Sequence, residues 1–494
     1  YQIKGNVVVY HCLKKFLLCI STASCLIFSS LSYADSQLPD IGTAGVSALS
    51  VEQEVLYGKA FMRFARASLP MIDDPVLDEY INDLGLSLVS QANNVRFPFT
   101  FFLVKDDSIN AAAFLGGRVK VHSGLFLHAE SESELAGVLA HEISHVTQRH
   151  IARYMEDQAK STPLSIAGLV GSIALAMLNP TAGAAAINTT MGLTMQNSIN
   201  FTRDNEYEAD RIGMGLLANA GYEPSGMMTF FQKLASENRY SSKLPEMLLT
   251  HPITENRIAE ARNRANSYKT RHRDSSLDFY LAKARIQAMY TNQEADSLIA
   301  YFDQNIKKSA PNTSAWLAAQ YGKSLALMKA HRSAEAGELL NTLLGKKPDN
   351  LFFQDSLTDQ EIDAQQYNAA ISRLEARDQT MQNNPVITMN LANVYLKANR
   401  AADSIRLLDQ YTRNNPESSV AWQLLAEAYQ QTANQAGFHQ AQAEYLALRG
   451  NIEQATDQLH MARANTADGL SQARIDARIA ELEEQKKVDD SLKR

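Results

Sequence analysis

Apolar residues recur at helical spacing through most of this chain, and alternation of apolar and polar positions is confined to one short region. Residues 51–90 are predicted to form two helices interrupted by prolines. Residues 97–106 and 118–126 are predicted to be β-strands, with a turn at Gly116-Gly117 before the second strand. The pattern favours an α+β fold that is mostly helical, with a small β-sheet.

A long helix is predicted over residues 131–155, and it begins with a serine suited to an N-cap. At roughly 100° per residue, His141 and His145 lie about 40° apart on this helix, whereas His150 is roughly 180° from His141. Only the first two can therefore share a metal ion. Glu142 adjoins them, which gives the H-E-x-x-H arrangement of two zinc ligands and a general base.

A second helix is predicted over residues 197–222 and carries a cluster of acidic residues. Glu206 and Asp210 are four residues apart and share one face, so Glu206 can supply a third metal ligand while Asp210 accepts the N–H of a ligand histidine. Glu208 is the rival ligand on the opposite face. Two histidines with one glutamate are typical of catalytic rather than structural zinc. The alternative is a solvated acidic face.

From about residue 275 the chain is continuously helical in pattern and poor in glycine and proline. Residues 422–429 fit the first helix of a tetratricopeptide repeat, and residues 388–395 fit the same register one repeat earlier. Stacked helix pairs of this kind form concave surfaces that bind extended or helical segments. A generic helical bundle is the alternative.

The length and net charge of the chain bear on the number of its domains and on nucleic-acid binding. With 494 residues and 45% hydrophobic residues, the chain can bury more than one core. Its formal net charge of −7 offers no basic surface for nucleic acid. We expect a signal peptide at residues 1–34, a metallopeptidase domain at 35–270 and a repeat domain at 271–494.

The signal peptide is expected from two lysines, a following apolar run and a small-residue cleavage site that ends at Ala34. All three cysteines precede residue 35, so cleavage leaves a chain without cysteine, which suits an oxidising compartment. An uncleaved anchor and lipidation at Cys25 are the alternatives. Because the first residue is Tyr1, the true start is left open, and residues 1–12 are candidates for upstream sequence.

The segment 163–195 raises the question of a membrane contact. Its uninterrupted apolar part, 166–178, is shorter than the ~20 residues that a membrane-spanning helix needs. We expect no span here. A flap that covers the cleft or makes peripheral contact with a membrane is one interpretation, and a buried hairpin is the other.

Three stretches together resemble a known family. These are HEISH at 141–145, the E-x-E-A-D pattern at 206–210, and INAAAFLGGRVKVHSGLF at 109–126. They are similar to the Ste-type and HtpX-type zinc metallopeptidases, and the helical repeats that follow resemble the periplasmic, BepA-like branch. The resemblance implies one zinc ion per chain, held by His141, His145 and Glu206. It also implies that Glu142 is the catalytic base and that Asp210 supports a ligand.

The resemblance further implies substrate contacts. In the family, the segment before the glycine turn is an edge strand that pairs with the substrate backbone, as an exposed edge can. An ordinary core strand is the alternative. The candidate substrate-binding residues are Asn110, Ala111, Ala112, Ala113, Phe114 and Arg257.

His251 is a further candidate, because the family has a His-Pro pair close to the metal. Pro252 favours an extended backbone at His251, and Thr254 can cap the helix that follows. Two functional roles are open: His251 is a donor that stabilises the oxyanion, or it is a direct metal ligand that keeps the enzyme latent. A distant loop residue is the third interpretation.

These observations predict a secreted, periplasmic zinc endopeptidase with chaperone-like activity. The resemblance implies that its clients are unfolded or stalled outer-membrane proteins and that it meets their assembly machinery. The alternative is a non-proteolytic scaffold or chaperone with a vestigial or structural metal site. Glu142 argues against that alternative, because a structural site has no use for a base.

Overall fold

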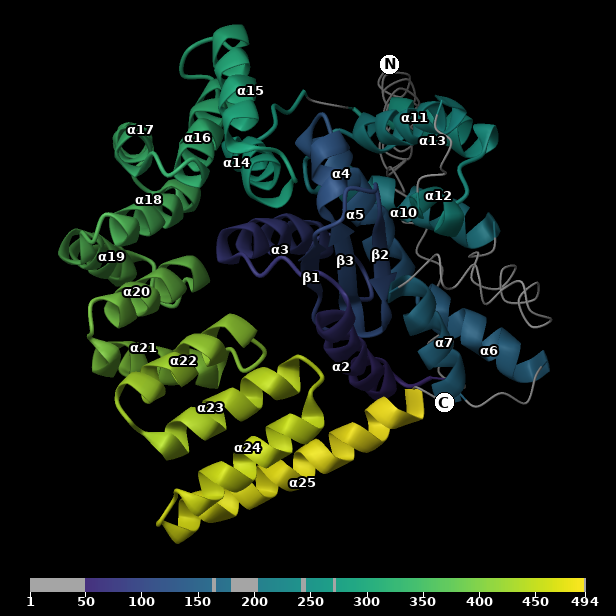
Figure 1. Ribbon diagram of the computed structural model, residues 1–494. Helices are drawn as coiled ribbons and strands as arrows, with labels where there is room; N and C mark the ends of the chain where they lie inside the picture. The colour runs from purple at the N-terminus through teal and green to yellow at the C-terminus, as the bar shows by residue number, and fades with distance from the viewer. Residues whose placement is uncertain (1–48, 162–165, 179–202, 241–245, 270–271, 493–494) are drawn as a thin grey trace, which may run out of the picture. The chain divides into compact units, whose positions relative to one another are not determined.

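The described part of the chain is mostly helical and contains one small sheet, so the predicted α+β class is confirmed (Figure 1). The predicted signal peptide and residues 163–165 and 179–195 of the predicted flap lie outside the described residues. The computed structural model describes residues 49–161, 166–178, 203–240, 246–269 and 272–492.

Two helices precede the sheet, as the pattern predicts. The first, α2 (Val51–Ser68), begins at a serine whose side chain accepts a hydrogen bond from the third residue of the helix. The second, α3 (Pro75–Val89), begins with Asp74 as its N-cap and with proline at its first position, where no helical N–H is needed. The apolar face of α3 packs against the first strand.

The sheet has three strands in the order β1-β3-β2. β1 (Thr100–Val104) runs parallel to β3 (Arg118–His122), whereas β2 (Ala111–Phe114) is antiparallel to β3. β2 is therefore an edge strand. The glycine turn between β2 and β3 is confirmed, with φ of 67° at Gly116 and 72° at Gly117.

The second strand is shorter than predicted from the sequence. Residues 123–126 continue as a helix, α4 (Ser123–His128), rather than as part of β3. The hydroxyl of Ser123 accepts from the backbone N–H of Asp106 and donates to its carbonyl. This side-chain pairing with the opposite segment ends the strand ladder, although the apolar pattern continues.

The helix predicted over 131–155 is divided in two, and this is a correction. α5 (Glu132–Thr147) ends before α6 (His150–Ser161) begins, and Arg149 between them is left-handed with φ of 52°. The buried guanidinium of Arg149 donates to the carboxylate of Glu54 at 2.6 Å. This tertiary ion pair outweighs the helical periodicity of the local sequence.

The helices that follow place the remaining site residues. No helix in the described ranges has both the length and the apolar character needed to cross a membrane. The glycine stop predicted after the second ligand helix is confirmed, because Gly221 adopts φ of 80°. These helices are α7 (Ile166–Leu178), α10 (Arg203–Asn219), α11 (Ser225–Tyr240), α12 (Glu246–Thr250) and α13 (Glu255–Ser267).

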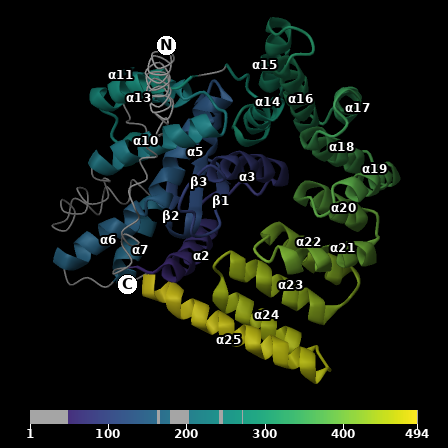
Figure 2. The same ribbon diagram turned by 180° about the vertical axis from the view of Figure 1, so that it is seen from behind.

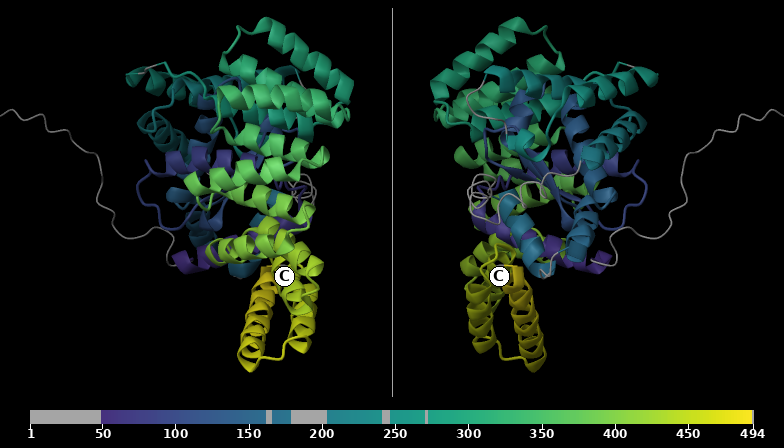
Figure 3. Two further views of the ribbon diagram at one scale, coloured as in Figure 1. Left: turned by 90° about the vertical axis from the view of Figure 1, so that its left-hand side faces the viewer. Right: turned by 90° about the vertical axis from the view of Figure 1, so that its right-hand side faces the viewer.

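The rest of the described chain is a succession of helix pairs (Figure 2). A short π-helical turn, Ile286–Tyr290, directly follows the first helix of this series. The last two, α24 and α25, lie side by side and are coloured yellow in Figure 3. The helices are α14 (Leu277–Arg285), α15 (Ala295–Lys308), α16 (Ser314–Lys329), α17 (Ser333–Lys346), α18 (Leu351–Asp363), α19 (Tyr367–Thr380), α20 (Pro385–Lys397), α21 (Ala401–Asn414), α22 (Ser419–Gln431), α23 (Gln435–Leu448), α24 (Ile452–Ala464) and α25 (Gly469–Leu492).

A repeat of 34 residues is visible in the backbone. Left-handed residues join the two helices of four successive pairs at His331, Gln365, Asn399 and Ala433, each 34 positions after the last. Residues 388–395 and 422–429, which predicted the repeat, lie in α20 and α22, the first helices of neighbouring pairs. The predicted tetratricopeptide register is confirmed.

Buried ion pairs join the helix pairs to the first part of the chain. Arg285 of α14 donates to Asp74 at the start of α3 at 2.6 Å and lies 2.8 Å from Asp355 of α18. Arg63 of α2 pairs with Asp489 of α25. The repeat helices are thus held against α2 and α3, which flank the sheet.

Candidate active site

Two histidines of α5 form the first half of the site. His141 and His145 lie one helical turn apart and are both buried. Their Nε2 atoms are 3.0 Å apart. The side chains leave the same face of the helix, as their spacing predicts.

Glu206 of α10 completes a three-residue cluster with these histidines. Its Oε2 atom lies 3.5 Å from Nε2 of His141, and its Oε1 atom lies 3.4 Å from Nε2 of His145. The carboxylate is buried. The structure therefore brings together the three residues that the sequence assigns as metal ligands.

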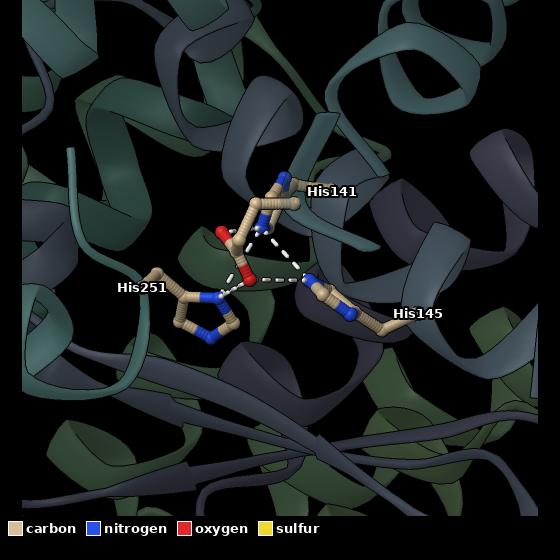
Figure 4. Close-up of side chains that lie close together, drawn as sticks. His141, His145 and His251 are labelled. Atoms are coloured by element: carbon tan, nitrogen blue, oxygen red, sulfur yellow. Dashed lines mark hydrogen bonds and ion pairs between the residues drawn. The ribbon is translucent and has the colours of Figure 1, made fainter. Parts of the chain in front are cut away.

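His251 joins the same cluster from the turn between α12 and α13. Its Nδ1 atom lies 3.0 Å from Oε1 of Glu206 and 3.4 Å from Nε2 of His141 (Figure 4). Thr254 caps α13, as predicted, and thereby fixes the turn that follows Pro252. The interpretation of His251 as a distant loop residue is wrong.

The four residues fit a metal ion of the zinc type. One ligand atom from each of His141, His145, Glu206 and His251 lies within 4.8 Å of the others, and all four side chains are buried. Imidazole nitrogens and a carboxylate oxygen are the donors that zinc prefers. An uncompensated cluster of such groups would be costly to bury, and a bound cation would offset that cost.

Glu142 lies beside the cluster and does not belong to it. Its Oε2 atom accepts a hydrogen bond from the backbone N–H of Ala113 at 2.9 Å, and its Oε1 atom lies 3.5 Å from Nε2 of His251. The side chain is buried. The carboxylate of Glu142 is therefore held between the edge strand β2 and the turn that carries His251.

Asp210 and Arg257 support the cluster from behind. Oδ1 of Asp210 lies 2.9 Å from Nδ1 of His141, which leaves Nε2 of that ring facing the cluster. Arg257 binds both oxygens of Asp210 at 2.8 Å and also lies 2.8 Å from Glu206. These contacts favour a positioning role for Arg257 over the substrate contact predicted from the sequence, because its buried guanidinium is occupied within the protein.

Glu208, the rival ligand, is turned away from the cluster. Its carboxylate lies 3.1 Å from Nε2 of His150 and 2.9 Å from Nη1 of Arg153. Glu206 and Glu208 therefore lie on opposite faces of α10, as predicted. The contact of His150 with the site was not predicted, because the angular argument assumed an unbroken helix from α5 into α6.

The candidate substrate-binding strand lies against Glu142. All of Asn110 and Ala111–Phe114 are buried in this structure. Asn110 donates from its side chain to Glu246. Ala113 directs its backbone N–H away from β3 and toward Glu142, so this edge of β2 faces the site. The structure places the strand beside the cluster, and the pairing of substrate with it stays a prediction.

Burial and charge shift the titration of the site residues. Burial raises the pKa of Glu142, and the neighbouring histidines oppose that shift. Burial disfavours the charged form of His141, but hydrogen bonds with Asp210 and Glu206 outweigh it and raise its pKa to about 10. Burial lowers the pKa of His145 well below its ordinary value. A metal ion that binds here must therefore displace a proton from His141.

The fold and the site together define the class of protein. Paired histidines on one helix, a glutamate on a second helix and a neighbouring base are the parts of an H-E-x-x-H metallopeptidase, and helix-pair repeats follow it. The family profile of peptidase family M48 matches residues 75–265, and a tetratricopeptide repeat profile matches residues 361–428.

Comparison with individual proteins extends this match to most of the chain. The chain is 46% identical over 459 residues to the beta-barrel assembly-enhancing protease of Escherichia coli (strain K12). The matched residues cover 91% of this chain and 92% of the relative. It is 46% identical over 453 residues to the protein of the same name from Yersinia pestis, with 91% and 92% covered. Metalloprotease LoiP of Escherichia coli (strain K12) is 28% identical over 203 residues, which are 39% of this chain and 73% of that protein. The chain belongs to peptidase family M48, with tetratricopeptide repeats, and is a metallopeptidase.

Proposed function

We propose that this protein is a zinc endopeptidase of the periplasm that acts on unfolded or stalled outer-membrane proteins. The observation that carries the proposal is the buried cluster of His141, His145, Glu206 and His251, with Glu142 beside it. The name of the 46% identical relatives, which refers to β-barrel assembly, supports the choice of clients. The predicted signal peptide at residues 1–34 supports the location.

Zinc held by His141, His145 and Glu206 would activate water and polarise the scissile carbonyl. Glu142 takes the proton of the attacking water and passes it to the leaving amine. Its burial favours this role, because a carboxylate in an apolar setting is a stronger base. Asp210 holds His141 in the tautomer that leaves Nε2 free, and Arg257 holds Asp210.

The edge strand β2 would bind the substrate as an added strand. Main-chain hydrogen bonds along such an edge accept many sequences, which suits unfolded clients. The N–H of Ala113 is taken by Glu142 in this structure. A substrate carbonyl that accepts from Ala113 would therefore release Glu142 to act on water.

His251 would keep the enzyme latent as a fourth protein ligand. A catalytic site keeps one position for water, and a site with four protein ligands is closed. The grouping of one donor atom of His251 within 4.8 Å of those of His141, His145 and Glu206 supports this role. Client binding to the repeat helices would move the turn between α12 and α13 and open the site.

The repeat helices α14–α25 would recruit clients and meet the outer-membrane assembly machinery. A peripheral contact of 163–195 with a membrane is part of the same proposal. The competing function is a scaffold or chaperone in which the metal is only structural. The position of Glu142 between β2 and His251 favours the peptidase, because a structural site needs no base there.

Removal and return of the metal test the proposal. We expect a chelator to abolish cleavage of a urea-unfolded outer-membrane β-barrel protein and added zinc to restore it. The Glu142→Gln protein, assayed for barrel assembly in a strain without the gene, shows whether a chaperone activity exists beside the peptidase. Cleavage that persists in metal-free protein would overturn the proposal.

A further inference from the structure

One ligand histidine has another histidine as its partner. Nδ1 of His145 lies 2.8 Å from Nδ1 of His150, and the two rings meet edge to face with centroids 4.8 Å apart. His150 is completely buried. Its other nitrogen, Nε2, lies 3.1 Å from Oε2 of Glu208.

The break between α5 and α6 creates this contact. Arg149 turns the backbone through a left-handed conformation, and His150 starts the next helix folded back over His145. Glu54 holds Arg149 in place from α2. Without the break, His150 would lie on the far side of the helix from the cluster.

The direction of each hydrogen bond follows from the role of His145 as a ligand. Its Nε2 atom must offer a lone pair to the metal, so its proton is on Nδ1 and is donated to His150. Nδ1 of His150 must then accept, which places the proton of His150 on Nε2. That N–H is donated to Glu208, and an ionised carboxylate can only accept.

The two ligand histidines are thus supported in different ways. His141 contacts Asp210 directly, and Arg257 locks that carboxylate in the interior. His145 is linked to the carboxylate of Glu208 only indirectly, through the neutral ring of His150. The terminal carboxylate, Glu208, is on the same helix as the ligand Glu206, and its side chain is 27% exposed.

We propose that His150 and Glu208 are positioning residues that fix the tautomer and the ring orientation of His145 for metal binding. The proposal rests on the zinc function above and adds two residues to it. Neither belongs to the cluster of His141, His145, Glu206 and His251. Loss of such outer partners typically weakens metal binding by roughly 10–100-fold.

The test is the zinc affinity of full-length variants, measured by competition with a chromogenic chelator. We expect His150→Phe, which keeps a ring but has no acceptor, to bind zinc about 10–100-fold more weakly than the unchanged protein. His150→Asn should recover most of this loss, because its side-chain oxygen can accept near the place of Nδ1. Glu208→Gln should lose part of the affinity, because the new amide can donate to Nε2 of His150. His150 would then donate from Nδ1 to His145, which would place the proton of His145 on Nε2, the atom that must bind the metal.

Asp204→Asn is the matched control, since it removes one exposed charge from the first turn of the same helix. It should leave the zinc affinity unchanged. Wild-type affinity in both His150→Phe and Glu208→Gln would overturn the proposal. If His150→Phe does not fold by circular dichroism, Glu208→Gln decides alone: wild-type affinity overturns the proposal, and weaker binding supports it. Protein that binds zinc with the expected pattern but cleaves nothing would contradict the proposed function and leave this inference intact.

Discussion

At the scale of single residues, His251 gives the sharpest prediction. It is close to both the ligand cluster and Glu142, so its removal affects metal and base together. As a latch, its loss opens a position for water, and His251→Ala should cleave an unfolded client faster than the unchanged protein. Initial rates at matched zinc content measure this. A loss of a hundredfold or more with zinc retained, about 2.7–4 kcal/mol of barrier, would assign the donor role instead. His439→Ala, a substitution on α23, is the control and should leave the rate unchanged.

The residues of the buried cluster could be predicted because helical spacing is a local property. His141 and His145, and likewise Glu206 and Asp210, are four residues apart, so one turn of helix brings each pair to one face. The contact of His150 with His145 could not be predicted in this way. This contact depends on a left-handed residue, and that residue is held by an ion pair with Glu54, nearly a hundred positions away.

At the scale of elements, the turn after α22 predicts a stabilising substitution. Ala433 has φ of 55°, and the N–H of Asn434 bonds to the carbonyl of Tyr429, which is a Schellman ending. A residue with a Cβ atom in this conformation costs roughly 1–2 kcal/mol, which glycine avoids. Ala433→Gly should therefore raise the free energy of unfolding by about 1 kcal/mol, measured by urea denaturation.

The same substitution elsewhere provides the control. Ala473 is exposed inside α25, where glycine should lower the free energy of unfolding by about 1 kcal/mol. Equal effects of Ala433→Gly and Ala473→Gly would contradict the role assigned to the turn.

The helices were predictable, and several of their ends were not. The four residues at the repeated turns are histidine, glutamine, asparagine and alanine, so no residue type marks the position. The sequence shows the 34-residue spacing in the first helices of two neighbouring pairs, whereas the positions of the turns appear only in the backbone. Similarly, β3 ends at His122 because Ser123 binds the backbone of Asp106, and the apolar pattern carries no sign of that bond.

At the scale of the whole molecule, Arg285 links the peptidase helices to the repeats. It is buried and binds carboxylates from both parts, Asp74 and Asp355. Arg285→Met would leave both carboxylates buried without this partner, and removal of one member of a buried pair costs about 3–5 kcal/mol. We expect a lower midpoint in urea denaturation for both parts. The control is Arg332→Met, whose midpoint should change far less, because its pair with Glu335 is exposed to solvent. A midpoint unchanged by Arg285→Met would show that the two parts do not depend on this link.

The order of the two parts along the chain could be read from the change of pattern near residue 275, but their attachment could not. Arg285 and Asp74 are separated by 211 residues, and Arg63 and Asp489 by 426. Pairs so distant leave no periodic signal in a single sequence. The predicted boundaries of 35–270 and 271–494 stay a prediction.

The proposed role of Glu142 as the base of a zinc peptidase can be tested directly by one substitution. Glu142→Gln keeps the shape of the side chain and leaves His141, His145 and Glu206 in place, but it removes the group that takes the proton. Zinc content and cleavage of an unfolded outer-membrane protein should be measured on the same sample. We predict one zinc per chain and no detectable cleavage. Full activity in the zinc-loaded variant would show that Glu142 is not the base.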